Sequence, residues 1–313
     1  SIVKHLVDAK ANIEAKNNNG DTPLIWASYN GHENIVKHLV DAKANIEAKD
    51  ENGNTPLNWA SENGHESIVK HLVDAKANIE AKDTYFGGTS LIRASENGHE
   101  SIVKHLVDAK ANIEAKTNDY NDGGTPLIWA SENGHESIVK HLVDAKANIE
   151  AKDIGGSTPL IFASGNGHES IVEHLVDAKA NIEAKNNNGR TPLIWASING
   201  HEDTVEHLVD AKANIEAKDK DGRTPLIYAS RNGDRSIVEH LVDAKANIEA
   251  KNNNGLTPLT IASDRGYGRI VQLLEAASRS RNNVDAPLSD EAIKRLFSRT
   301  TPWRRSRVMI VGK

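Results

Sequence analysis

Fourteen histidines make metal binding and acid–base catalysis the first chemistry to consider in this chain. All of them recur at two fixed places in a repeated phrase. The first set follows a glycine and comprises His32, His65, His99, His135, His168 and His201. The second set comprises His5, His38, His71, His105, His141, His174, His207 and His240. A side chain copied so many times predicts a structural role rather than a single reactive site.

The spacing of the histidines argues against a shared metal ion. His32-Glu33 resembles the opening of the H-E-x-x-H zinc motif, but the next histidine follows six residues after the first. Six residues place the second side chain about 240° around a helix, whereas the four-residue spacing of the motif keeps both imidazoles on one face. The sequence also lacks a nucleophile elbow and a unique acid–base pair. We therefore expect no enzymatic activity, no catalytic or metal-binding residue and no cofactor.

An aromatic residue also recurs once per phrase and could stack on nucleic-acid bases. The aromatic column consists of Trp26, Trp59, Trp129, Phe162, Trp195 and Tyr228. Each member lies inside the first predicted helix of its unit, and packing in the core is the interpretation that we favour. Arg93 interrupts the column, and core packing does not explain it.

These columns belong to a segment that repeats about every 33 residues, which is typical of a solenoid. A Thr-Pro-Leu box marks each unit, and Thr89-Ser90-Leu91 is a variant of it. The boxes lie 33 residues apart, except for spacings of 34 and 36 before and after the variant. The prolines of the boxes are Pro23, Pro56, Pro126, Pro159, Pro192, Pro225 and Pro258.

Each unit predicts a helix, a turn, a second helix and an extended loop. In the second unit, Thr55 suits an N-cap and Pro56 suits the first helical position. Asn63-Gly64 ends that helix, and an apolar stripe that includes Ile68 and Leu72 follows at helical spacing. Helices this short do not persist alone in water, so we expect neighbouring units to stabilise one another by stacking.

Thr-Pro-Leu, Ala, Asn-Gly-His, Ile-Val, Leu-Val and Ala-Asn-Ile, in this order, resemble the ankyrin repeat. The resemblance implies an all-α solenoid of helix–turn–helix units with short β-hairpin loops. It covers residues 1–276, as one half repeat and eight units. It also implies a protein–protein interaction scaffold, which binds its partner through the hairpin tips and the concave face of the first helices.

Three departures from the family pattern change what is expected. Isoleucine mostly replaces the histidine after Thr-Pro-Leu, which predicts apolar contact between units in place of a polar one. Glu47 and Glu80 stand where the family has an asparagine that can be hydroxylated, so that modification is not expected. Lysine replaces the glycine that ends the second helix, and we expect it in the left-handed region. These lysines are Lys10, Lys43, Lys76, Lys110, Lys146, Lys179, Lys212 and Lys245.

Composition narrows the class of partner. The chain has no cysteine, which excludes disulfides and thiolate metal sites and fits a cytoplasmic protein, with the nucleus left open. It has no apolar run of membrane-spanning length and no signal peptide before Ser1. Residues 277–313 carry a net charge of +6 and the array carries −12. An acidic array is a poor binder of nucleic acid, so we expect the partner to be another protein. We also expect no membrane binding and a monomeric state.

The residues that vary between units are the candidates for partner binding. One variable column ends the first helices and includes Tyr29, Glu62, Glu96, Glu132, Ile198 and Arg231. A second column precedes the Thr-Pro-Leu box and includes Asp21, Asn54, Arg190, Arg223 and Leu256. The three glutamates predict an acidic patch that suits a basic partner. A solvated surface without a binding role is the alternative.

Two longer loops, at residues 83–88 and 117–124, are a further candidate. Tyr85, Phe86 and Tyr120 lie in them, and large apolar side chains on projecting loops indicate contacts. The alternative is that these units are decaying, since Ser90 and Arg93 also depart from the pattern.

Residues 277–313 predict a polar linker, a short helix near 289–297 and a strand at 307–311 that ends in Gly312. The strand resembles the first strand of P-loop GTPases, particularly the Roc type, although the Gly-Lys-Ser/Thr that would complete the motif is absent. The alternative function is therefore the recognition arm of a larger GTP-binding signalling protein, whose P-loop domain begins near Arg307.

Overall fold

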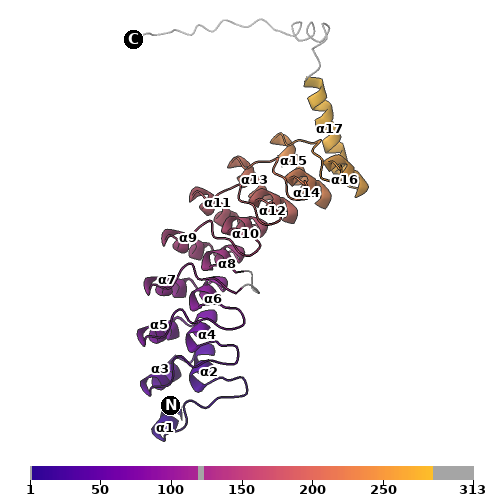
Figure 1. Ribbon diagram of the computed structural model, residues 1–313. Helices are drawn as coiled ribbons and strands as arrows, with labels where there is room; N and C mark the ends of the chain where they lie inside the picture. Colours follow the sequence, from indigo (N-terminus) through magenta and orange to yellow (C-terminus); the bar gives the residue numbers. More distant parts are fainter. Residues whose placement is uncertain (1, 119–122, 285–313) are drawn as a thin grey trace, which may run out of the picture.

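A computed structural model describes residues 2–118 and 123–284 as a curved stack of helix pairs (Figure 1). The first helices of the eight units are α2 (Pro23–Tyr29), α4 (Pro56–Glu62), α6 (Ser90–Glu96), α8 (Pro126–Glu132), α10 (Pro159–Gly165), α12 (Pro192–Asn199), α14 (Pro225–Asn232) and α16 (Pro258–Asp264). The second helices, beginning with the half repeat, are α1 (Ile2–Asp8), α3 (Glu33–Asp41), α5 (Glu66–Asp74), α7 (Glu100–Asp108), α9 (Glu136–Asp144), α11 (Glu169–Asp177), α13 (Glu202–Asp210), α15 (Arg235–Asp243) and α17 (Gly268–Val284). The predicted all-α solenoid is confirmed.

Threonine caps begin every first helix, as the sequence predicts. Thr55 Oγ1 accepts a hydrogen bond from the backbone N–H of Asn58 at 3.2 Å, and Pro56 occupies the first turn. The equivalent threonines cap the other seven first helices. This satisfies a backbone donor that the helix itself leaves unpaired.

The core is a continuous layer between the two columns of helices rather than a central cluster. In the second unit, Leu57 and Ala60 of α4 and Val69 and Leu72 of α5 are at most 1% exposed. The helices from α2 to α15 have seven to nine residues, fewer than the roughly 12–15 that a helix needs to persist alone. Each unit therefore depends on its neighbours for stability.

Two ladders of side-chain hydrogen bonds join the loops of successive units. In the first, a glutamate carboxylate accepts from a backbone N–H of the next unit, as Glu47 Oε1 does from Asn78 at 2.8 Å. In the second, a lysine donates to a carbonyl oxygen of the next unit, as Lys49 Nζ does to Lys82 at 3.3 Å. The glutamates that replace the family's asparagine thus hold neighbouring loops together.

The loops turn back tightly, and no strand is assigned among the residues that the structure describes. The backbone N–H of Asp50 donates to the carbonyl oxygen of Asn54 at 3.1 Å, and Asp50 Oδ1 accepts from the N–H groups of Asn52 and Asn54. The expected β-hairpins are therefore turns stabilised by their own first side chain. Figure 1 shows that the loops project beside the first helices, on the inner side of the curve.

The isoleucines of the column after Thr-Pro-Leu make the predicted apolar contact, while Asn58 and the exposed Thr260 are the two exceptions. Ile25, Ile92 and Ile128 are at most 1% exposed. Asn58 is also buried, and its Nδ2 donates to the carbonyl oxygen of Ala81 at 3.2 Å and to Ser90 Oγ at 3.4 Å. The serine in the variant box therefore has a polar partner in the preceding unit.

The end of the array differs from the prediction. A polar linker was expected from about residue 278, but α17 continues as one helix to Val284. Arg281 Nη2 donates to the carbonyl oxygen of Ala246 at 3.0 Å, which ties this helix to the preceding unit. The predicted short helix near 289–297 and the predicted strand at 307–311 lie outside the described residues. Within the described ranges, the helices are all too short or too polar to span a bilayer.

The lysines that end the second helices adopt the left-handed conformation, as predicted. Their φ angles run from 60° at Lys10 to 73° at Lys245, and Lys43 lies at 67°. A residue with a Cβ atom is strained there by on the order of 1 kcal/mol, whereas glycine is not. The chain tolerates this cost eight times.

We expect Lys43→Gly to raise the melting temperature by about 1–3 °C, because it removes left-handed strain from an exposed position. Differential scanning calorimetry of the whole chain measures the shift. Lys43→Ala is the matched control, since it removes the same side chain but keeps the Cβ atom, and we expect no gain from it. An equal response of the two variants would contradict the explanation by strain.

Candidate functional site

Most of the aromatic column is only partly buried on the first helices, which corrects the prediction of core packing for every member except Tyr228. Trp26 is 54% exposed and Tyr228 is 4% exposed, while the four members between them are half-buried. On α2, Pro23, Trp26 and Tyr29 share one exposed stripe, and Leu24 and Ala27 face the core. We define the concave face as this stripe on the even-numbered helices together with the loops that precede them.

The first two units form an aromatic depression on the concave face. The rings of Trp26 and Tyr29 stack with centroids 6.1 Å apart, and Tyr29 meets Trp59 edge to face at 5.0 Å. Trp59 Nε1 donates to Asp50 Oδ2 at 2.9 Å. The depression has a volume of about 290 Å³, and its lining consists of Asn19, Asp21, Trp26, Tyr29, Asp50, Asn52 and Trp59.

Arg93, which interrupts the aromatic column, is the centre of an ion-pair cluster in the third unit. Its Nη2 donates to Asp83 Oδ2 at 3.0 Å, and its Nη1 lies 3.5 Å from Glu62 and 3.8 Å from Glu96. The guanidinium also lies 4.3 Å from the ring centroid of Phe86. These contacts explain the exception, because a cation here is surrounded by carboxylates and an aromatic face.

Burial of Arg93 and its partners makes the cluster energetically sensitive. The Asp83 side chain is 1% exposed and accepts hydrogen bonds from the backbone N–H groups of Phe86, Gly87 and Gly88. Burial raises the pKa values of Glu62 and Glu96 above their usual range, although Arg93 opposes that effect. Two of the three glutamates of the predicted acidic patch are therefore already paired within the chain. The third, Glu132, is half-buried.

Phe86 does not project into solvent, and the prediction that it is an exposed contact is wrong. Its side chain is 9% exposed and packs with Ile92, Ala115 and Trp129, whose ring lies 5.3 Å away. Asp83 holds the backbone of the loop so that the phenyl ring turns inward. Tyr85, its neighbour, is 77% exposed, and Tyr120 lies outside the described residues.

Arginines replace carboxylates toward the other end of the concave face. Arg190 lies over the ring of Trp195, with its guanidinium carbon 5.0 Å from the centroid. Arg223 lies over Tyr228 at 5.7 Å and pairs with Asp221 at 2.8 Å. A hydrogen bond with Tyr228 raises the pKa of Arg223 above its usual range.

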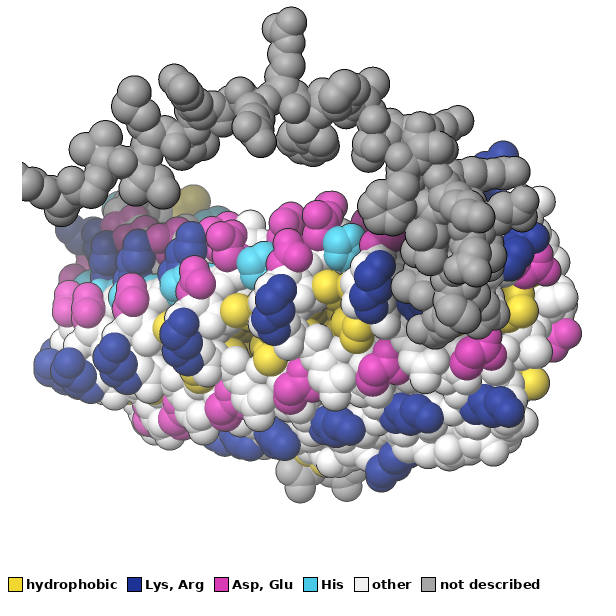
Figure 2. All heavy atoms as spheres, turned by 90° about the horizontal axis from the view of Figure 1, so that it is seen from above, with side chains coloured by type: hydrophobic (Ala, Val, Ile, Leu, Met, Phe, Trp, Pro, Cys, Tyr) yellow, Lys and Arg dark blue, Asp and Glu magenta, His cyan; other side chains and the backbone are white. Residues whose placement is uncertain are grey.

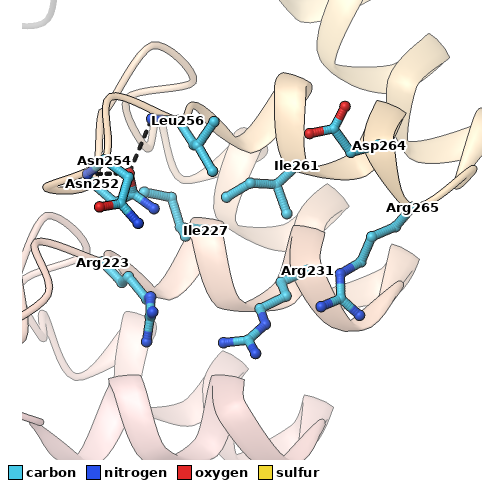
Figure 3. Close-up of a pocket in the computed structure, with 9 residues that line it drawn as sticks. All are labelled: Arg223, Ile227, Arg231, Asn252, Asn254, Leu256, Ile261, Asp264 and Arg265. Atoms are coloured by element: carbon cyan, nitrogen blue, oxygen red, sulfur yellow. Dashed lines mark hydrogen bonds between the residues drawn. The ribbon is translucent and has the colours of Figure 1, made fainter.

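A second depression, of about 220 Å³, lies beside Arg223 (Figure 3). Arg231 from α14 and Arg265, which follows α16, point the same way there as Arg223. Leu256 and Ile261 form its apolar side. Ile198, another predicted contact, lies on α12 and packs against Ile194 of the same helix and Tyr228 of α14. The concave face thus changes from aromatic and acidic to arginine-rich along the array.

The histidines that follow glycine join successive units. His65 Nε2 lies 3.0 Å from the carbonyl oxygen of Tyr29, and because a carbonyl only accepts, the imidazole donates. The same bond forms from His99, His135, His168 and His201. A Cβ atom on Gly31 would lie 2.6 Å from the His65 ring, so the glycine makes room for the next unit. Among the described residues, no three His, Asp or Glu side chains converge as metal ligands would.

The sequence interpretation missed Trp26, Trp59 and Asp50 as surface residues. The signal that could have found them is the spacing within the first helix. Trp26 lies three residues from both Pro23 and Tyr29, whereas Leu24 and Ala27 are three residues apart on the adjoining face. At 3.6 residues per turn, the two sets occupy different stripes.

Comparison with known proteins agrees with this architecture. A family model described as "Ankyrin repeats (3 copies)" matches residues 1–83, 81–153, 151–219 and 211–285. Among solved structures, the chain is similar to the crystal structure of the human ASB11 ankyrin repeat domain, with 25% sequence identity and a TM-score of 0.65. That similarity covers 71% of this chain and 98% of the human domain. No curated protein sequence matches the chain.

We expect Arg93→Met to destabilise the array by about 3 kcal/mol, because it leaves the carboxylate of Asp83 buried without its cation. Urea denaturation followed by circular dichroism measures the loss. The matched control is Lys104→Met, which removes a cation from the exposed pair with Glu100 and is expected to have a much smaller effect on the urea midpoint. Equal losses would contradict a buried ion-pair cluster.

The raised pKa values of Glu62 and Glu96 predict a pH dependence of stability. The stability that these two carboxyl groups contribute is fully present below their pKa in the unfolded chain. It is lost as pH rises through their raised pKa in the folded chain. We therefore expect Glu62→Gln/Glu96→Gln to gain stability relative to the unmodified chain as pH rises from about 4.5 to 7. Urea midpoints at several pH values measure the difference.

Glu66 supplies the control of opposite sign for this experiment. Its hydrogen bond with Lys70 lowers the pKa of its carboxyl, so its contribution is present above the unfolded pKa and is lost as pH falls. We expect Glu66→Gln to lose stability relative to the unmodified chain over the same rise in pH. Variants that change in the same direction would contradict the assignment of these shifts.

Proposed function

The chain belongs to the ankyrin repeat family, and from that premise we propose that it is a protein-interaction scaffold whose partner lies along the concave face. Ankyrin repeats are generally protein-binding modules without catalytic activity. The observation that carries the proposal is the set of aromatic side chains on this face: Tyr29 meets Trp59 edge to face at 5.0 Å, and Tyr85 is 77% exposed. Aromatic residues in a depression are the usual anchors of protein interfaces.

The proposed contacts follow the concave face from one end of the array to the other. Tyr29 contributes an aromatic contact at the first end, and Arg231 contributes a charged contact at the other. The full set is Tyr29, Glu62, Tyr85, Glu96, Glu132, Arg190, Ile198, Arg223 and Arg231. Of the loop residues, Tyr85 is retained for its exposure, and the buried Phe86 supports the loop from beneath.

The graded charge of this face supports a partner with charge of both signs. Asp21 and Asp50 line the first depression, which favours a basic segment there. Arg231 and Arg265 line the second depression, which favours an acidic segment. The other side of the array, where the second helices lie, is a different surface: Lys70 pairs with Glu66, and Lys104 with Glu100, within the same helix.

Regular rows of basic and acidic side chains are visible in Figure 2, which shows one face of the array from above. Rows that repeat in every unit carry little information that could select one partner. The concave face differs from unit to unit, so it supports selective binding better. We infer further that the chain acts as a monomer. A chain without cysteine fits a reducing compartment, so we place it inside the cell, in the cytoplasm, with the nucleus left open.

The test is capture of the partner from an extract of the cells that make the protein. We expect Tyr29→Ala/Tyr85→Ala/Arg231→Ala to reduce the captured partner at least about tenfold, as loss of interface anchors does. Quantitative mass spectrometry of the captured proteins measures the change. The matched control is Lys37→Ala/Lys70→Ala/Lys104→Ala on the second helices, which is expected to retain capture. Equal capture by both variants, with unchanged melting curves, would contradict binding through the concave face.

A further inference from the structure

We propose that the aromatic depression of the first two units binds an arginine side chain of the partner. The inference rests on the proposed function and specifies the chemistry of one contact within it. The rings of Trp26, Tyr29 and Trp59 would contact the guanidinium, and the carboxylates of Asp21 and Asp50 would balance its charge.

The later units of the same chain show where such a guanidinium lies. Arg190 lies over Trp195 with its guanidinium carbon 5.0 Å from the ring centroid, and Arg223 lies over Tyr228 at 5.7 Å. In both units, the arginine precedes the aromatic residue by five positions, at the end of the loop that leads into the first helix. In these two units, an arginine of the chain itself therefore lies over the aromatic residue, and we call it the internal arginine.

The first two units have the aromatic rings but lack this internal arginine. The residues five positions before Trp26 and Trp59 are Asp21 and Asn54. No cation–π contact forms at Trp26 or Trp59, within the part of the chain that the structure describes. Trp26 and Trp59 therefore lie at the positions where the later units have a guanidinium.

A carboxylate also lies beside the guanidinium at two of these arginine sites, as Asp21 and Asp50 lie in the first depression. Arg223 pairs with Asp221 at 2.8 Å while lying over Tyr228. In the third unit, Arg93 lies over Phe86 and donates to Asp83 at 3.0 Å. An aromatic ring, a carboxylate and a guanidinium therefore recur together along the concave face. The first depression supplies two of these three groups.

Arginine fits this depression better than lysine for two physical reasons. Its planar guanidinium stacks on an aromatic face and remains charged, and it gives several hydrogen bonds in a fixed geometry. Asp21 and Asp50 lie on the loops of successive units and could accept such bonds. Their charge also complements the cation, whereas it would repel an acidic side chain.

The test is NMR titration of the whole 15N-labelled chain with a capped peptide, Gly-Ser-Gly-Arg-Gly-Ser-Gly. We expect saturable shifts of the indole N–H signals of Trp26 and Trp59, and no shift at Trp195, which Arg190 already covers. Single Trp→Phe variants assign the signals. The same peptide with citrulline, which is neutral and similar in shape, is expected to bind at least about fivefold more weakly. A lysine peptide is expected to bind more weakly than the arginine peptide.

Two variants exchange the properties of the two sites. Asp21→Arg supplies an internal arginine in the register of Arg190, so it should abolish the shifts at Trp26. Arg190→Asn removes the internal arginine and places there the residue found at position 54, so it should make the Trp195 signal respond to the arginine peptide. Both positions lie in loops before the Thr-Pro-Leu box, and unchanged melting curves would confirm that both variants fold.

Specific outcomes would overturn the proposal. Absence of saturable shifts at Trp26 and Trp59 up to about 20 mM peptide would do so, since binding weaker than this is negligible. Equal shifts with the citrulline peptide, or tighter binding of the lysine peptide, would also do so. Partner capture separates this inference from the proposed function. If Asp21→Arg retains capture while Tyr29→Ala/Tyr85→Ala/Arg231→Ala loses it, the concave face binds the partner without an arginine at this site.

Discussion

Every feature of this molecule depends on contact between one unit and the next, because no helix from α2 to α15 is long enough to persist alone. The contact is specific in its geometry. His99 donates from Nε2 to the carbonyl oxygen of Glu62 at 2.8 Å, and a Cβ atom on Gly64 would lie 2.6 Å from the same imidazole. The glycine and the histidine thus set the distance between adjacent first helices. That distance in turn sets how far apart the aromatic rings of the concave face lie, so the frame determines the shape of any binding surface on it.

The irregular third and fourth units keep this frame through new contacts. Ser90 replaces the proline of the box, and it accepts a hydrogen bond from Asn58 of the preceding unit. Arg93 replaces an aromatic residue, and Asp83 of the longer loop receives its guanidinium. Phe86 from that loop packs on Trp129 of the following unit. Three departures that look unrelated in the sequence therefore have partners in space. The three departures therefore support one another and keep the frame of the irregular units intact.

Much of the fold could be predicted from the sequence, because it depends on local rules that act within one unit. The N-cap of Thr55 and the left-handed Lys43 are examples, since each follows from a few adjacent residues. The candidate site was predicted less well, because it depends on contacts between units. Trp59 looks like a core residue in a seven-residue helix, yet it is only half-buried, against Tyr29 of the preceding unit. Phe86 looks exposed in a long loop until the carboxylate of Asp83 turns that loop inward. The partners of Arg93 lie on three different elements, and no spacing in the sequence reveals them.

The near-identity of the units has a consequence for specificity. Side chains that repeat in every unit offer a partner the same contact at many registers, so they cannot fix where it binds. The positions that differ most on the concave face are the end of the first helix and the residue five places before the aromatic column. Both contact the aromatic ring: Tyr29 meets Trp59, and Arg190 lies over Trp195. A change at either position therefore alters the exposure and charge of the ring while the frame stays the same. Selectivity can thus change along the array while the histidine bonds and the loop ladders that join the units stay the same. Glu62 is the exception, since it varies and also pairs with Arg93 of the next unit.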